Sequence, residues 1–121
     1  MAEPIVLEQM ATVSSSLEVQ PAMRAAFVGD HRELLFFVTA EVQGDGTLTV
    51  GPQTSIEPTE ELFVNAVSTE SFLTFTSGGD KSKVLQLDRF GAYLRWSGWV
   101  SVTGTSGTFS VRLLLKEQDR W

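Results

Sequence analysis

Hydrophobic and polar residues alternate along most of the chain after its first thirty residues. In the stretch ELLFFVTAEVQ, every second residue from Leu34 is apolar, and most of the residues between them are polar. Successive side chains of a strand point to opposite faces, so this pattern predicts a half-buried β-strand over 34–42. Leu35 and Phe37 interrupt the polar face. Either both faces of this strand are covered, or one of them presents apolar surface to a partner.

The rest of the chain divides into short β-rich segments separated by glycine, proline and polar residues. Gly44-Asp45-Gly46 predicts a hairpin turn between the first strand and a second one over 47–50. Polar and apolar residues alternate less regularly before residue 30, where SSSLEVQP is compatible with a strand and 21–28 is weakly helical. Further strands are expected over 62–68, 72–76, 84–87, 92–102 and 109–115, with a short helix starting in 57–61 as the alternative to the first of these.

About eight short strands without helical periodicity between them predict an all-β fold. Because the strand lengths are uneven, we expect a jelly-roll-like antiparallel β-sandwich rather than a closed barrel. A chain of 121 residues is long enough for one domain with its own hydrophobic core. We therefore divide it into an N-terminal arm or first strand at 1–28 and a β-sandwich domain at 29–121.

Two tryptophans in the stretch RWSGWV raise the question of whether they bind a ligand or fill a core. Trp96 and Trp99 are three residues apart, so they point to opposite sides of a strand. Trp96 lies on the more apolar face and is expected in the core. Trp99 shares the other face with Tyr93 and Arg95. That face is covered by another part of the chain, forms a protein interface or stacks on a sugar ring.

Composition narrows the classes of partner. The chain has 15 acidic and 9 basic residues and a net charge of −6, which argues against binding to nucleic acid. It has no cysteine, so disulfides and thiolate metal sites are excluded. The longest apolar stretch, 34–38, is far shorter than the roughly 20 residues that cross a bilayer. The acidic start of the sequence lacks the basic residues of an export signal, so we expect a soluble protein without a membrane partner.

Candidate catalytic residues do not form a known pattern. The single histidine, His31, would need additional positioned groups to act as a base or metal ligand, and Asp30 and Glu33 are not spaced to converge with it on a strand. The remaining acids that invite a catalytic interpretation are better explained as loop residues; they are Glu57, Glu60, Glu61 and Glu70. We therefore expect no enzyme activity, no cofactor and no metal site.

The C-terminal third, LQLDRFGAYLRWSGWVSVTGTSGTFSVRLLLK, resembles a pattern of small structural proteins of tailed bacteriophages. In that pattern, G-x-Y-L/V-R enters one strand and V-T/S-G-T-S-G-T precedes F-S-V in the last strand. Sugar-binding jelly-roll modules share a strand that begins with an aromatic residue, an aliphatic residue and an arginine, which anchors loops. The residues that carry the resemblance are Gly91, Tyr93, Leu94, Arg95, 102–107 and 109–111.

The resemblance implies a non-enzymatic virion protein, with a capsid decoration (cement) protein as the leading interpretation. Such a protein would be made in the bacterial host cytoplasm and would stabilise the shell through contacts with the major capsid protein or another virion protein. A homo-oligomer is expected, with a trimer favoured. The alternatives are a neck or tail accessory protein and a carbohydrate-binding jelly-roll module. The candidate interface residues are Leu35, Phe37, Tyr93, Arg95, Trp99 and Trp121.

Under this interpretation, residues 1–28 form an arm that embraces a neighbouring subunit. Deletion of 1–20 is then expected to leave the sandwich folded and to abolish assembly.

Overall fold

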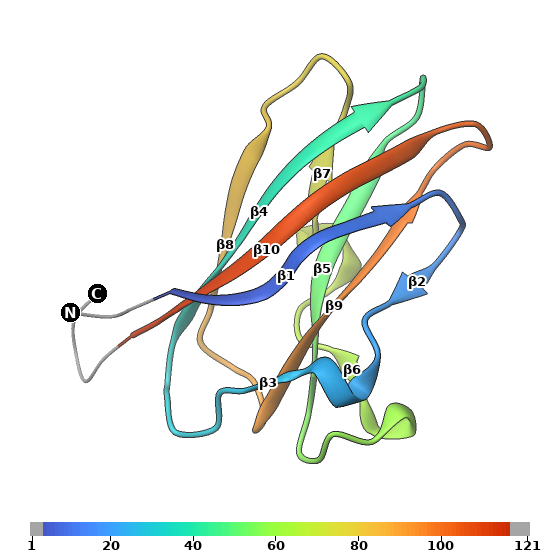
Figure 1. Cartoon of the computed structure of the whole chain (residues 1–121). Coiled ribbons are helices and arrows are strands. Elements are labelled where there is room, and N and C mark those ends of the chain that lie inside the picture. The colour runs from blue at the N-terminus through green and yellow to red at the C-terminus, as the bar shows by residue number, and fades with distance from the viewer. Residues whose placement is uncertain (1–3, 117–121) are drawn as a thin grey trace.

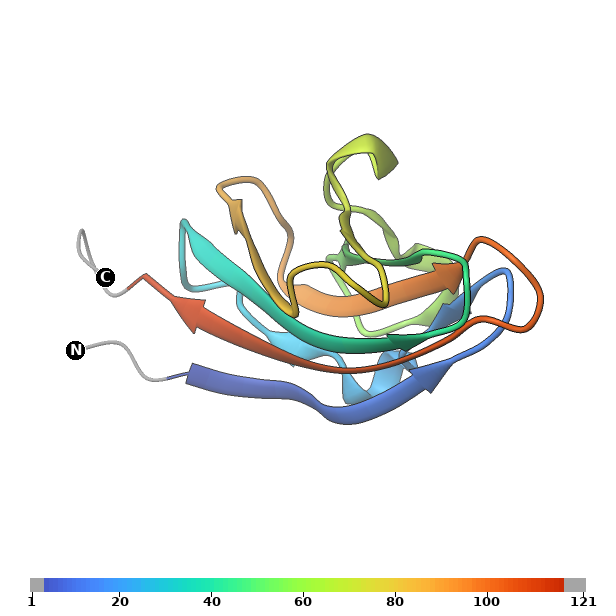
Figure 2. The ribbon, with the colours of Figure 1, turned by 90° about the horizontal axis from the view of Figure 1, so that it is seen from above.

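The computed structural model describes residues 4–116, which form two antiparallel β-sheets packed face to face (Figure 1, Figure 2). Sheet A has the order β1 (Pro4–Val13), β10 (Ser106–Leu115), β4 (Leu34–Gln43) and β8 (Ser82–Leu87). Sheet B has the order β2 (Glu18–Val19), β9 (Tyr93–Val100), β5 (Leu48–Ser55) and β6 (Val64–Asn65). Two short strands extend this sheet: β3 (Ala26–Phe27) pairs with β9, and β7 (Leu73–Phe75) pairs with β5. The predicted all-β, jelly-roll-like sandwich is confirmed.

The predicted strand over 34–42 is present as β4, in the middle of sheet A between β10 and β8. The alternation in its sequence matches its burial, because every second residue from Leu34 is buried in the interface between the sheets. The strands predicted over 84–87, 92–102 and 109–115 are present as β8, β9 and β10. Strands that carry their own period-two signal were therefore predictable.

The predicted hairpin at Gly44-Asp45-Gly46 is wrong. The strand before this turn, β4, belongs to sheet A, and the strand after it, β5, pairs with β9 in sheet B. Gly44 does have the positive φ that the sequence suggested, at 108°, and the amide of Gly46 donates a hydrogen bond to Thr105 Oγ1 at 2.9 Å. A turn signal fixes the local backbone but not the sheet that the next strand joins, so this turn connects the two layers.

The strand predicted over 62–68 is also largely wrong. A 3₁₀ turn occupies Glu60–Leu62, close to where the alternative short helix was placed, and only Val64–Asn65 is a strand. Another 3₁₀ turn at Thr69–Ser71 precedes β7. Branched and aromatic residues in this segment pack as an irregular cover on sheet B, and β-propensity alone does not distinguish that role from a strand.

The N-terminal residues are part of the sandwich. β1 pairs with β10 along the edge of sheet A, and β2 and β3 pair with β9 in sheet B (Figure 1). Leu7 and Val13 of β1 are buried in the core. Within residues 4–28, the described chain therefore contributes to both sheets of its own molecule, which fits the first-strand alternative for 1–28 and not a separable arm.

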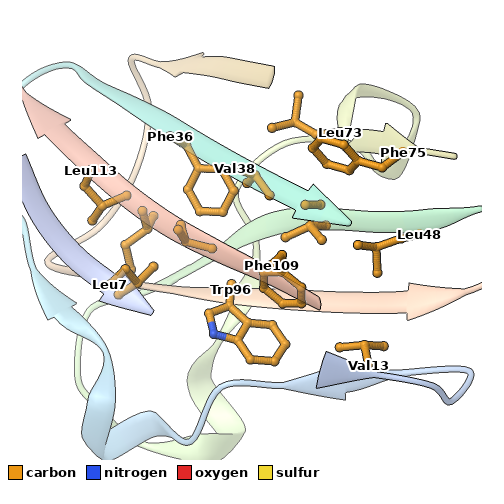
Figure 3. Close-up of a cluster of buried hydrophobic side chains, with 14 of the residues drawn as sticks. Leu7, Val13, Phe36, Val38, Leu48, Leu73, Phe75, Trp96, Phe109 and Leu113 are labelled. Atoms are coloured by element: carbon orange, nitrogen blue, oxygen red, sulfur yellow. The ribbon is translucent and has the colours of Figure 1, made fainter. Parts of the chain in front are cut away.

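Trp96 lies in the core between the two sheets, as its position in the sequence predicted (Figure 3). Its ring meets that of Phe109 edge to face, with 4.9 Å between ring centroids and an interplanar angle of 88°. Most of the remaining core consists of branched aliphatic and aromatic residues from both sheets, including Leu7, Val13, Phe36, Val38, Leu48, Val50, Phe75, Leu94 and Leu113. This continuous core fixes one sheet on the other.

We expect Trp96→Ala to lower the free energy of unfolding by about 3 to 5 kcal/mol, because it removes a large core aromatic and leaves a cavity. Urea denaturation followed by circular dichroism measures the change. Met23→Ala is the control, because Met23 is exposed and its truncation should change stability by less than about 0.5 kcal/mol. Equal stability of the Trp96→Ala variant and the unmodified chain would contradict the assignment of Trp96 to the core.

Deletion of residues 1–20 is now expected to abolish cooperative folding. The deletion removes an edge strand, uncovers the hydrogen-bonding edge of β10 and takes Leu7, Val13 and Gln20 out of the buried interior. Thermal unfolding of the truncated chain tests this expectation. A cooperative transition near the melting temperature of the intact chain would instead support the separable arm.

Candidate interaction surfaces

The outer face of sheet B is covered by the chain itself. Residues 56–72 connect β5 to β7 and include the edge strand β6; the rest of this segment lies largely on the side of sheet B that faces away from sheet A (Figure 2). The ring of Phe72 lies directly over Gly51, and a Cβ atom at position 51 would come within 2.2 Å of this ring. The centroid of the same ring lies 5.6 Å from that of Trp99. Only a glycine at position 51 lets this aromatic ring approach the strand so closely.

Arg95 anchors this cover. Its Nε donates a hydrogen bond to Gln53 Oε1 at 2.9 Å, and its Nη1 donates to Glu60 Oε1 at 2.6 Å and to the carbonyl oxygen of Gln20 at 3.0 Å. The ring of Phe63 stacks over the guanidinium, with 4.2 Å from Cζ to the ring centroid. One arginine on β9 therefore holds the residues after β2, the neighbouring strand β5 and the covering segment together.

Glu60 is the acidic partner in this cluster. Its second carboxylate oxygen accepts a hydrogen bond from the amide of Ala22 at 2.6 Å. The Ala22 amide and then Arg95 hold the pKa of Glu60 below its usual value of 4.5. Glu60 is 58% exposed whereas Arg95 is 5% exposed, so the pair places a buried cation against a carboxylate at the surface.

A second polar cluster lies inside the sandwich, beneath the start of β1. Glu8 Oε1 accepts a hydrogen bond from the indole Nε1 of Trp96 at 3.0 Å, and its other oxygen pairs with Arg24 at 3.2 Å. The pairing of β1 with β10 shifts register on both sides of Glu8, so Leu7 and Glu8 are both buried although they are neighbours in a strand. Because a bulge breaks the period of two, the sequence pattern gave no sign of this buried carboxylate.

Gln20 joins the two clusters. Its side-chain amide donates to the carbonyl oxygen of Leu7 at 2.7 Å and accepts from the amide of Trp96 at 3.4 Å. The Gln20 side chain is fully buried, and both ends of its amide are hydrogen-bonded, as buried polar groups require. The residues after β1 are thereby tied to both β1 and β9.

These contacts decide between the alternatives for Tyr93, Arg95 and Trp99. Arg95 is buried under Gln53, Glu60 and Phe63, so its assignment to an accessible interface is wrong. Tyr93 and Trp99 are half-buried, and Tyr93 meets an aromatic ring of β3 at 5.5 Å between centroids. The alternative in which another part of the chain covers this face is the one observed. Trp121 lies outside the described residues.

The outer face of sheet A is open. Leu35 and Phe37 lie on it side by side in β4, and the register brings Val6, Arg112, Phe37 and Val84 into one row across the four strands. The next row contains Pro4, Leu114 and Leu35 and ends at the polar Gln86 of β8. Phe37 is 40% and Val84 48% exposed. We call this surface the end patch; its residues are Pro4, Val6, Leu35, Phe37, Val84, Leu114 and Arg112.

The other half of the same face is mainly polar, with Met10 of β1 as an exposed apolar residue beside Thr108 and Ser110. Thr12 and Thr108 hydroxyls lie 3.0 Å apart, and those of Thr39 and Ser82 lie 3.1 Å apart. An ion pair of Lys81 with Glu41, at 2.7 Å, occupies the far corner. The end patch is therefore a bounded apolar area at the end of the sandwich where β1 begins and β10 ends. Whether Leu35 and Phe37 contact a partner there stays a prediction.

The residues considered for catalysis are dispersed. Asp30 Oδ1 lies 2.7 Å from His31 Nδ1 without hydrogen-bond geometry, and Glu33 pairs instead with Lys116 at 3.2 Å. Within residues 4–116, no three His, Cys, Asp or Glu side chains converge in a way that would hold a metal ion. In the same range, no helix has the length and apolar character needed to cross a membrane.

No protein-family model and no curated protein sequence match this chain. Solved structures share its fold. A Bacillus endospore appendage protein, from disulfide-linked pili, is 9% identical with a TM-score of 0.51, over 95% of this chain and 86% of that chain. A Triatoma virus empty-capsid protein is 7% identical with a TM-score of 0.50, over 95% and 88% of the two chains.

A third similar structure comes from Clostridium thermocellum xylanase 10B, a chain with CBM22-1 and GH10 modules complexed with xylohexaose. It is 11% identical with a TM-score of 0.53, and the match covers 99% of this chain but only 25% of that chain. At such low identities these likenesses show the β-sandwich fold alone.

Acid should weaken the attachment of the covering segment. Because the pKa of Glu60 is lowered in the folded state, its contribution to stability is complete above the unfolded value near 4.5 and is lost as the pH falls through the lower folded value. Glu60→Gln should therefore be less stable than the unmodified chain at pH 7, and the difference should shrink below pH 4.5. Urea unfolding of both proteins between neutral and acid pH measures this; a difference independent of pH would contradict it.

Proposed function

We propose that this chain is a non-enzymatic structural protein of a virion, a capsid decoration protein that binds the shell through the end patch of sheet A. The observation that carries the proposal is the asymmetry of the two outer faces. Residues 56–72 pack over Gly51, Arg95 and Trp99 on the central strands of sheet B, whereas Phe37 and Val84 stay exposed in one row of sheet A. A clustered apolar patch of this kind is a feature of protein–protein interaction sites.

Three further features support a binding role of this sort. The sandwich fold is shared with capsid and pilus subunits, the acidic chain carries a net charge of −6, and the sequence resembles small phage structural proteins. An acidic surface keeps such a protein from adhering to nucleic acid packaged in the shell. The expected partner is the major capsid protein or another virion protein, and binding as a trimer would match the symmetry of a shell.

The carbohydrate-binding alternative has less support. It required Tyr93, Arg95 and Trp99 to form an accessible platform, but Arg95 is buried beneath Phe63 and Trp99 packs against Phe72. A sugar would have to displace residues 56–72 together with the hydrogen bonds that Arg95 donates. The neck or tail accessory role uses the same kind of protein contact as decoration and differs from it in the location within the particle.

Phe37→Glu combined with Val84→Glu should abolish binding of the purified chain to particles of the virus that encodes it. The two carboxylates would bring charge into an apolar contact that excludes water, at a large desolvation cost. Co-sedimentation of the chain with the particles measures binding, and the melting temperature of the shell, with and without bound chain, measures stabilisation.

Val64→Glu is the matched control, because Val64 is a 62% exposed valine on the other sheet. This variant should bind like the unmodified chain. Equal binding by the double variant and the control would remove the end patch from the proposal. Failure of the unmodified chain to sediment with any particle, together with specific binding to a glycan array, would favour the carbohydrate-binding module instead.

A further inference from the structure

The end patch contains one charged side chain, and it is basic. Arg112 lies in the second strand of the row, directly between Val6 of β1 and Phe37 of β4. Its Nη1 donates one hydrogen bond, to Ser110 Oγ at 3.3 Å. Among residues 4–116, no carboxylate lies within ion-pairing distance of this guanidinium, although the chain has 15 acidic residues. By contrast, Arg24, Lys81, Arg95 and Lys116 each pair with a carboxylate.

A partner that covers this patch must satisfy the guanidinium. Covering the apolar rows removes water from Arg112, and an arginine that loses its water without gaining an acceptor opposes binding. The planar guanidinium is best satisfied by a carboxylate, which accepts two parallel hydrogen bonds from it. A single arginine surrounded by apolar residues lacks the second cation that clustered phosphate sites provide, so the geometry favours a protein carboxylate.

The shape of the patch adds a second requirement. A shallow groove of about 320 Å³ lies beside Arg112 and is lined by Pro4, Phe37, Thr39, Leu113 and Leu114. Its walls are mostly apolar and come from three adjacent strands of sheet A. Such a groove accepts an aliphatic or aromatic side chain next to the position where the carboxylate would lie.

We infer that the end patch binds a segment of a partner protein in which an Asp or Glu stands next to a large apolar residue. The carboxylate pairs with Arg112 and the apolar side chain enters the groove. This inference rests on the proposed function in that the patch is the docking surface, and it specifies the chemistry of the shell segment that docks there. Charge complementarity between this basic side chain and an acidic partner sets which segments bind.

The test uses the full chain on an array of immobilised hexapeptides. Each peptide has a central Leu, Phe or Trp flanked by Asp or Glu, and a matched peptide carries Asn or Gln at the flanking position. The unmodified chain should bind the acidic peptides more tightly than their amide counterparts. Arg112→Gln should lose about 10- to 100-fold in affinity for the acidic set, the scale of a hydrogen bond to a charged group.

Charge reversal provides the sharper readout. Arg112→Glu should prefer peptides that carry Lys or Arg at the flanking position, which a purely structural role for Arg112 would not produce. Arg89→Gln is the control, because Arg89 is an exposed arginine in the loop between β8 and β9. It should retain the preference of the unmodified chain. Thermal unfolding confirms that all variants are folded.

Several outcomes would overturn the inference. No preference for acidic peptides, or the same preference in Arg112→Gln, would show that the arginine does not select the partner. Sedimentation velocity showing a dimer of the chain that Phe37→Glu dissociates would assign the patch to a second copy instead. If particles bind the unmodified chain and Arg112→Gln equally, the inference is refuted and the decoration role stands. If particles bind neither protein, the decoration role is refuted. The peptide array then still decides the inference.

Discussion

The hydrogen bonds that Arg95 donates determine which surfaces of this molecule are available. A buried guanidinium must find acceptors, and Arg95 finds them on Gln20, Gln53 and Glu60, which belong to three separate parts of the chain. The hydrogen bond to Glu60 holds residues 56–72 against sheet B, and the hydrogen bond to Gln20 holds the residues after β2 against β9. The outer face of sheet B is thereby removed from the surface, and sheet A is left as the open face.

The two polar clusters have different consequences. Glu8, Gln20 and the indole nitrogen of Trp96 form a buried network that joins the N-terminal strand to the core of the sandwich. Removing any one member would leave a buried donor or acceptor without a partner. The Arg95–Glu60 pair reaches the surface and therefore responds to pH. The first network makes the N-terminal residues part of the fold, while the second closes one face of it.

The proposed function follows from the outer face of sheet A, which residues 56–72 do not cover. Apolar side chains cluster at one end of sheet A around Arg112, with serine and threonine residues on the remaining half of that face. A surface of this composition favours binding to a protein over binding to a sugar. The sugar alternative lacks an open platform, because Trp99 packs against Phe72, Tyr93 packs against an aromatic ring of β3 and Arg95 is buried beneath Phe63. The likeness to capsid and pilus subunits concerns the fold and adds no information about this patch.

The sequence alone determined the elements that carry their own periodicity. Strands such as β4 and β10 bury every second residue, so their alternation predicted both the strand and the face toward the core, and it placed Trp96 inside. It also identified Leu35 and Phe37 as apolar residues on an otherwise polar face. These features are local, because the alternation of a strand depends only on residues that are neighbours in the sequence.

Tertiary structure alone decided how these elements combine. The glycine turn after β4 connects two sheets instead of forming a hairpin, residues 4–28 join the sandwich, and Arg95 is buried under a segment that begins before Glu60. Each of these outcomes depends on a contact between residues that are far apart in the chain. A pattern of neighbouring residues specifies which face of a strand is apolar, but the segment that comes to cover that face is selected by packing and hydrogen bonding in the folded molecule.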